Sequence, residues 1–117
     1  MADFNCPEMQ EALEKISNRN YSAAVRLLIP LAHKGNPKAQ CNLAALYQFG
    51  LGVNPDGRKA VELYVKVAKQ NITEESLSAI AYHNLATIYI TGIPGVKPDR
   101  SQAEEYKKLA KDLGFPV

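Results

Sequence analysis

Apolar residues recur along this chain at intervals of three and four positions, the spacing that places side chains on one face of an α-helix. The first such run carries Met9, Leu13 and Ile16, and five further runs follow it. No stretch has the alternation of apolar and polar residues that is typical of a half-buried strand. The pattern predicts six helices and no strand, over residues 8–17, 21–34, 37–49, 56–70, 73–89 and 99–113.

Residues that favour helix ends separate these runs. Asn, Asp and Thr favour the N-cap position, and glycine favours the position just past a C-terminus. The expected N-caps are Asn36, Asp56, Thr73 and Asp99. Two glycine-bearing loops, residues 50–55 and 92–98, each join two helices. We therefore expect three helix hairpins, at about residues 8–34, 36–70 and 73–113, in a single domain spanning residues 1–117.

The helical pattern repeats along the chain. The apolar stripe at residues 24–32 recurs 36 residues later at residues 60–68, and Asn42, Leu43 and Tyr47 recur 42 residues later. A repeat of this length that consists of two helices is typical of an α-solenoid, in which each hairpin buries its apolar face against its neighbours. The predicted fold class is all-α, with three hairpins stacked in a row.

The stretch from Ala39 to Ala68 resembles a Sel-like repeat, which is a relative of the tetratricopeptide repeat. The matching residues are Ala39, Asn42, Leu43, Tyr47, Gly50, Gly52, Val53, Asp56, Lys59, Ala60, Tyr64, Lys66 and Ala68. A second copy keeps Ala81, Asn84, Leu85, Tyr89, Gly92, Gly95, Val96, Asp99, Ala103 and Ala110. The N-terminal hairpin is a degenerate copy without the glycine loop.

This resemblance implies a short right-handed superhelix in which the first helix of each hairpin lines the concave side. Proteins of the family are adaptors that bind other proteins or peptides, and many are bacterial. Some are regulators, some are secreted factors that interact with a host, and some are immunity partners of toxins. The junction before the third hairpin departs from the pattern, because it is six residues longer than the junction before the second. We expect these residues to lengthen the fifth helix at its start.

Charge and composition exclude several classes of function. The net charge is +2, and the 14 basic and 12 acidic residues are interspersed, whereas a nucleic-acid-binding protein usually has a clustered basic face. No apolar run approaches the ~20 residues of a membrane-spanning helix. The N-terminal residues lack the basic start and apolar run of a secretory signal, which favours the cytoplasm. Cys6, Cys41, His33 and His83 have no metal-ligand spacing, so we expect free thiols, no metal and no cofactor.

The candidate partner-binding residues are those that point outward from the first helices of the second and third hairpins. They are Lys38, Cys41, Ala45, Gln48, Phe49, Tyr82, His83, Thr87 and Ile90. Phe49 and Ile90 are apolar at helix ends where the core does not need them. They either anchor a partner segment or pack under the loops beside Leu51 and Ile93, and the sequence leaves both readings open.

An alternative function rests on Cys41 and His83, which occupy equivalent repeat positions and would lie near each other in adjacent hairpins. A thiol beside an imidazole is a possible nucleophile, and the pair would suit an enzyme or a small-molecule-binding protein. No third orienting group is apparent. The leading hypothesis is a protein without catalytic activity that binds a protein or peptide, as an adaptor, a regulator or a toxin-immunity inhibitor. Lys107, Lys108 and Lys111 give the last helix a polar outer face, so a monomer is expected.

Overall fold

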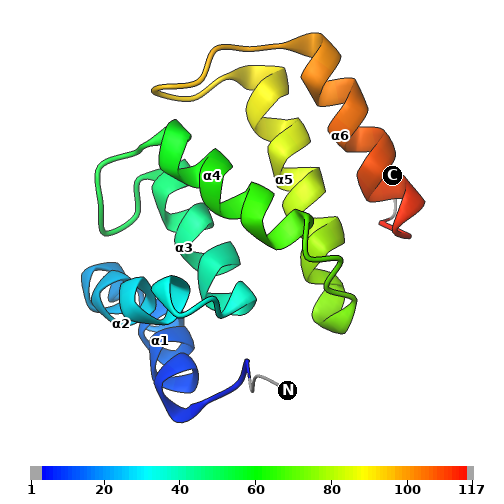
Figure 1. Ribbon diagram of the computed structural model, residues 1–117. Helices are drawn as coiled ribbons and strands as arrows, with labels where there is room; N and C mark the ends of the chain where they lie inside the picture. Colours follow the sequence, from blue (N-terminus) through cyan, green and yellow to red (C-terminus); the bar gives the residue numbers. More distant parts are fainter. Residues whose placement is uncertain (1–3, 116–117) are drawn as a thin grey trace.

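The computed structural model describes residues 4–115, which form six α-helices and one short 3₁₀ turn (Figure 1). The helices are α1 (Pro7–Ser17), α2 (Tyr21–His33), α3 (Pro37–Phe49), α4 (Gly57–Ala68), α5 (Leu77–Thr91) and α6 (Arg100–Asp112), and the 3₁₀ turn η1 is Glu74–Ser76. The prediction of six helices without a strand is confirmed for this part of the chain. Residues 1–3 and 116–117, which belong to the predicted domain, lie outside the described residues.

Side-chain caps begin four of the six helices. The side-chain oxygens of Asn20, Asn36, Asp56 and Asp99 each accept a hydrogen bond from the backbone N–H three residues later. Each bond satisfies one of the N–H groups that a helix start leaves without a partner inside the helix. The predicted caps of α3, α4 and α6 are therefore confirmed.

The predicted start of the fifth helix is wrong. Thr73 makes no capping hydrogen bond, and α5 begins at Leu77. Glu75 and Ser76 have positive φ angles of 52° and 56°, so the backbone turns here instead of extending the helix. The Ser78 hydroxyl fixes this turn, because it donates to the carbonyl of Val67 and accepts from the N–H of Ile72. The extra residues of the junction thus fold back onto the end of α4.

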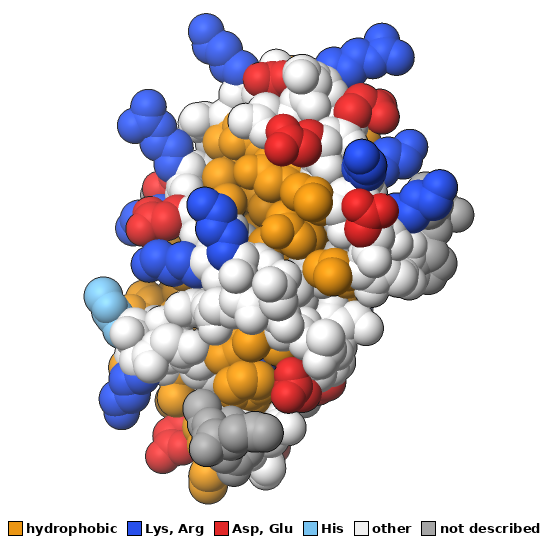
Figure 2. Space-filling view, turned by 45° about the vertical axis from the view of Figure 1, so that its right-hand side comes forward, with side chains coloured by type: hydrophobic (Ala, Val, Ile, Leu, Met, Phe, Trp, Pro, Cys, Tyr) orange, Lys and Arg blue, Asp and Glu red, His pale blue; other side chains and the backbone are white. Residues whose placement is uncertain are grey.

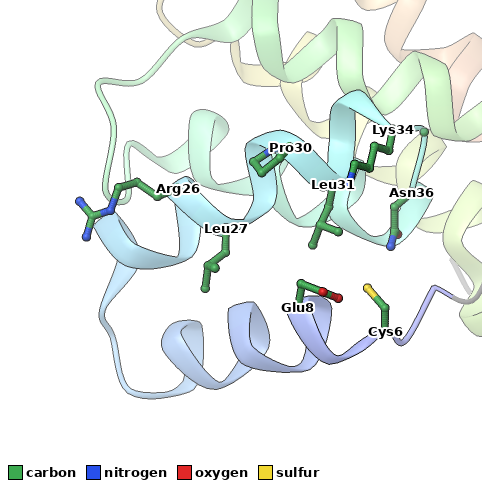
Figure 3. A pocket seen from close by; sticks show the side chains of 9 residues that line it. Cys6, Glu8, Arg26, Leu27, Pro30, Leu31, Lys34 and Asn36 are labelled. Carbon is green, nitrogen blue, oxygen red and sulfur yellow. The ribbon is translucent and has the colours of Figure 1, made fainter.

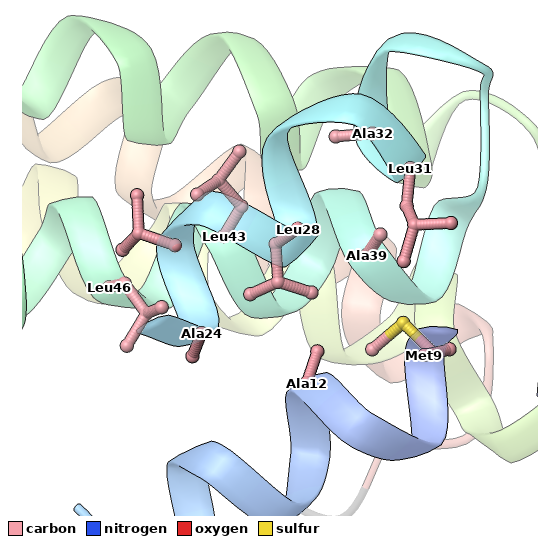
Figure 4. Packing of buried hydrophobic residues seen from close by; sticks show 10 residues of the cluster. Met9, Ala12, Ala24, Leu28, Leu31, Ala32, Ala39, Leu43 and Leu46 are labelled. Atoms are coloured by element: carbon pink, nitrogen blue, oxygen red, sulfur yellow. The ribbon is translucent and has the colours of Figure 1, made fainter. Parts of the chain in front are cut away.

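The helices pair as α1–α2, α3–α4 and α5–α6, and the three hairpins follow one another from the blue to the red end of the chain (Figure 1). One buried cluster lies where α1, α2 and α3 meet; it includes Met9 and Ala12, Ala24 and Leu28, and Leu43 and Leu46 (Figure 4). A second cluster lies among α3, α4 and α5. Each cluster is shared between successive hairpins, so no hairpin buries its apolar face alone, as expected for a solenoid.

The two glycine loops also join successive hairpins. A Cβ atom added at Gly52 would lie 2.6 Å from the backbone carbonyl carbon of Tyr21, where α2 begins. One hairpin later, the N–H of Gly57 at the start of α4 donates a 2.7 Å hydrogen bond to the carbonyl of Pro94. A Cβ at Gly57 would lie 2.6 Å from that oxygen. Each loop therefore packs directly against the start of the preceding hairpin's second helix, an approach that only glycine permits.

Candidate protein-binding surface

Lys38, the first residue of the predicted surface, is engaged in contacts within the chain. The Lys38 ammonium donates to the side-chain oxygen of Asn5 at 2.7 Å and to both carboxylate oxygens of Glu75 at 3.0 Å. The side-chain amide of Asn36 donates to the carbonyl of Phe4, which holds the N-terminal segment beside α3. Lys38 thus links the N-terminal segment to the turn before α5, and its charge is already paired.

Two of the predicted surface residues are buried, which corrects the expectation that they point outward. Cys41 packs into the second cluster with Tyr64, Leu77 and other residues of α4 and α5. Gln48 is buried as well, and its side-chain oxygen accepts a 2.8 Å hydrogen bond from the Tyr64 hydroxyl. Residues of α5 cover Cys41 and Tyr64 of α4 covers Gln48, and helix periodicity within α3 cannot show which side a neighbouring helix will occupy.

The apolar residues at the ends of α3 and α5 are exposed. Phe49 has 66% of its surface accessible and Ile90 has 61%. Ala45 and Thr87, one turn earlier in each helix, are half-buried. The reading in which Phe49 and Ile90 pack under the loops is therefore wrong. We call Ala45, Phe49, Thr87 and Ile90 the α3–α5 face.

The structure does not support Cys41 and His83 as a reactive pair. Burial raises the pKa of the Cys41 thiol from 9.0 to about 11, so the thiol stays protonated near neutral pH. A protonated thiol is a poor nucleophile. The imidazole of His83 is exposed and stacks on the ring of Phe115, with 4.3 Å between ring centroids. The two side chains thus have different surroundings, one in the core and one at the surface.

Tyr82 belongs to a group of three tyrosines between α5 and α6. Its ring stacks on that of Tyr106 with 6.0 Å between centroids, and the Tyr89 ring stacks on Tyr106 with 5.9 Å between centroids. Burial raises the pKa of Tyr106, and the neighbouring Tyr89 raises it further. Tyr82 is half-buried, so most of its role is packing between the two helices of the third hairpin.

A hollow of about 410 Å³ lies between α1 and α2 (Figure 3). The sequence did not predict it. Cys6 and Glu8 lie at the start of α1 and face Leu27 and Leu31 of α2, and Lys34 lies at the end of α2. Hydrogen bonds from its own backbone N–H and from the Cys6 thiol lower the pKa of Glu8. The hollow is lined by one acidic side chain, Glu8, and two basic ones, Arg26 and Lys34, beside an apolar floor, and it does not overlap the α3–α5 face. Pro30, which also lines the hollow, lies inside α2, where a proline removes one backbone N–H from the helix.

Charged side chains of both signs are interspersed on the face shown in Figure 2, around a group of hydrophobic side chains. Within residues 4–115, no helix is both long and apolar enough to cross a membrane. In the same part of the chain, no three His, Cys, Asp or Glu side chains are grouped so that they could hold a metal ion.

Stacked helix hairpins with shared cores and an exposed helix face define the class of helical-repeat proteins. Within that class the chain belongs to the Sel1 repeat family, because the Sel1 repeat model matches residues 37–72 and 79–115, more than half of the chain. The two matches correspond to the second and third hairpins. Proteins with Sel1 repeats generally mediate protein–protein interactions.

The chain is similar to parts of two longer proteins. The chain is 32% identical over 92 residues to chitin synthase regulatory factor 3 of Schizosaccharomyces pombe; the match covers 79% of this chain and 9% of that protein. It is also similar to the crystal structure of a Sel1 repeat protein from Oxalobacter formigenes, with 28% identity and a TM-score of 0.63. That match covers 80% of this chain and 35% of the other. This chain thus spans a small part of the length of either relative.

Proposed function

We propose that this protein binds another protein or peptide through the α3–α5 face and has no catalytic activity. The observation that carries the proposal is the exposure of Phe49 and Ile90, two large apolar side chains in the last turns of neighbouring helices. Exposed apolar side chains on a regular helix surface serve as anchors in recognition of peptides and helices. The buried, protonated Cys41 thiol supports the absence of catalysis, because it removes the main candidate nucleophile.

The role we propose is that of an adaptor or regulator. The name of the related S. pombe protein, a regulatory factor, supports this role over that of a toxin inhibitor. The protein acts by placing one partner segment along the α3–α5 face, with the hairpin stack as a rigid support. Partner choice then depends on which side chains occupy the ends of α3 and α5, since the starts of these helices are engaged in internal contacts.

The test is affinity capture from extracts of the source cells, with quantitative mass spectrometry of the bound proteins. The Phe49→Asp/Ile90→Asp variant should lose the specifically bound partner, because two charges replace the apolar anchors. Ile29→Asp is the matched control, since Ile29 is another exposed apolar residue, 40% accessible, on α2. The proposal is wrong if the double variant retains the partner or if Ile29→Asp loses it equally.

A further inference from the structure

A small hollow of about 150 Å³ lies at the C-terminal end of the stack, between α5 and α6. Ala86 and Ala110 are its buried floor, and Ile90, Lys107 and Lys111 surround it. The Phe115 ring also contributes to its lining, where it stacks on His83. This hollow is distinct from the one between α1 and α2.

Repeat equivalence shows what kind of surface this is. Along α3 and α5 the equivalent positions are 42 residues apart, and along α4 and α6 they are 43 apart, as the matching caps Asp56 and Asp99 show. Ala86 therefore corresponds to Ala44, and Ala110 corresponds to Val67. The earlier counterparts of the α5 and α6 residues that line the hollow are Cys41, Ala44, Ala45, Gln48, Tyr64, Val67 and Ala68.

In the earlier repeat, the equivalent surface is covered by helix α5. Cys41, Ala44, Tyr64, Val67 and Ala68 are buried in one cluster with four residues of α5, namely Leu77, Ala81, Leu85 and Ile88. A hydrogen bond accompanies the apolar contact: the Asn84 side-chain amide of α5 donates to the Tyr64 hydroxyl at 3.2 Å. The hollow at the end of the stack is thus a second copy of a helix-binding surface whose occupant is known in the first copy.

The second copy differs from the first in charge. Lys107 stands where the first copy has Tyr64, and Lys111 stands where it has Ala68. Polar residues are expected at the end of a solenoid, and this explains the two lysines. It does not explain Ile90, which stays 61% exposed beside them where the first copy has the buried Gln48.

We propose that this end surface binds an amphipathic α-helix of a separate partner protein, with a carboxylate that pairs with Lys107. The apolar side of that helix follows the spacing of Leu77, Ala81, Leu85 and Ile88, because the floor of the hollow repeats the floor on which α5 packs. Its carboxylate takes the position that Asn84 has in α5. An ammonium group in place of the Tyr64 hydroxyl favours an acidic residue at that position and disfavours a basic one. This inference rests on the proposed protein-binding function but concerns another surface. The end surface and the α3–α5 face have only Thr87 and Ile90 in common.

The test uses two synthetic peptides that are stapled on their solvent side and checked for helicity by circular dichroism. Both carry Leu, Ala, Leu and Ile at the spacing of the α5 residues. One has glutamate at the Asn84 position and the other has lysine there. We expect fluorescence anisotropy to show about tenfold tighter binding of the glutamate peptide, as like charges oppose binding of the lysine peptide.

Charge reversal provides the matched controls. Lys107→Glu/Lys111→Glu should invert the preference between the two peptides, whereas Lys97→Glu/Lys108→Glu, with the same change in net charge away from the hollow, should preserve it. The inference is overturned if neither helical peptide binds, if both bind equally, or if the two double variants behave alike. It is also overturned if sedimentation shows a dimer that Lys107→Glu/Lys111→Glu dissociates, because a second copy would then cover the surface.

The Phe49→Asp variant separates this inference from the proposed function. Phe49 belongs to the α3–α5 face and does not line the hollow. Phe49→Asp should therefore leave the preference for the glutamate peptide unchanged, and a loss of that preference would contradict a separate end site. Absence of peptide binding together with loss of the captured partner in Phe49→Asp/Ile90→Asp would overturn the end site alone.

Discussion

The Tyr64 hydroxyl donates a 2.8 Å hydrogen bond to the side-chain oxygen of Gln48, and both residues are buried. The same hydroxyl accepts a hydrogen bond from Asn84, so one oxygen atom joins α3, α4 and α5. Burial raises the pKa of Tyr64, and the hydroxyl remains a donor over the whole physiological range. The polar bonds thus fix the register of the third hairpin on the second.

Replacing Tyr64 by Phe should destabilise the fold by about 1–3 kcal/mol, because the buried oxygen of Gln48 loses its donor. In urea unfolding followed by circular dichroism, Tyr64→Phe/Gln48→Leu should be less destabilised than the sum of the two single variants. The double change removes the donor and the acceptor of this bond, which leaves no orphaned oxygen, and the Asn84 amide loses its acceptor equally in Tyr64→Phe and in the double variant. If the loss of stability in the double variant equals the sum of the losses in the two single variants, Tyr64 and Gln48 are not energetically coupled.

Leucine residues of the shared cores and the exposed Phe49 should respond very differently to truncation. Leu85→Ala should lower the free energy of unfolding by ~2–5 kcal/mol, because Leu85 is fully buried in the second cluster. Phe49→Ala should change it by less than about 0.5 kcal/mol, as is usual at the surface. Thermal and urea denaturation of both variants measure the contrast. A similar loss in both would place the Phe49 ring in the core.

Gly57→Ala should destabilise the stack although alanine favours helices. The added Cβ would lie 2.6 Å from the Pro94 carbonyl oxygen, so the second glycine loop would have to shift and its 2.7 Å hydrogen bond would lengthen. We expect a loss of about 1–3 kcal/mol, the usual cost of overpacking. Arg58→Ala, at the next and exposed position of α4, is the control and should be nearly neutral. Equal stability of both variants would contradict this contact.

Stability should fall at alkaline pH because of the Cys41 thiol. In the unfolded chain the thiol ionises near 9.0, whereas in the folded protein its pKa is about 11. The unfolded state therefore releases its proton first, and the contribution of the neutral thiol is complete below pH 9 and is lost as the pH rises to about 11. The loss is on the order of 3 kcal/mol. Urea midpoints measured across this range should fall less steeply in Cys41→Ala than in Cys6→Ala, and identical slopes would refute the assignment.

The two thiols should also differ in reactivity. Cys6 is half-buried at the start of α1, whereas Cys41 is buried with a raised pKa. An aromatic disulfide reagent at pH 8 should label Cys6 in the folded protein and label Cys41 only after unfolding, which mass spectrometry of the peptides can show. His83→Ala should not alter the rate at Cys41. Rapid labelling of Cys41 that depends on His83 would restore the reactive-pair hypothesis.

The site was harder to predict than the fold. The exposed position of Phe49 and Ile90 could be inferred only as one of two readings, since a helix end beside a loop permits either packing or exposure. Lys38 and Gln48 have the spacing of surface residues along α3, yet one is paired with Glu75 and the other is buried against Tyr64. Both partners lie in other elements, and helix periodicity carries no information about them. The hollow at the end of the stack is lined by residues of α5, α6 and the segment after α6, and the spacing within either helix does not reveal it.

The sequence alone specifies the helices, most of their caps and the repeat, because these depend on interactions between residues a few positions apart. It also determined that Asp56 and Asp99 begin equivalent helices, since the cap bond spans only three residues. The packing of the hairpins on one another buries Cys41 and leaves its counterpart His83 exposed. The physical reason is that α5 packs over the first position, and among residues 4–115 no further helix packs over the second. Burial in a repeat protein is set by the neighbouring repeat, and identical local patterns therefore become core in one hairpin and surface in the next.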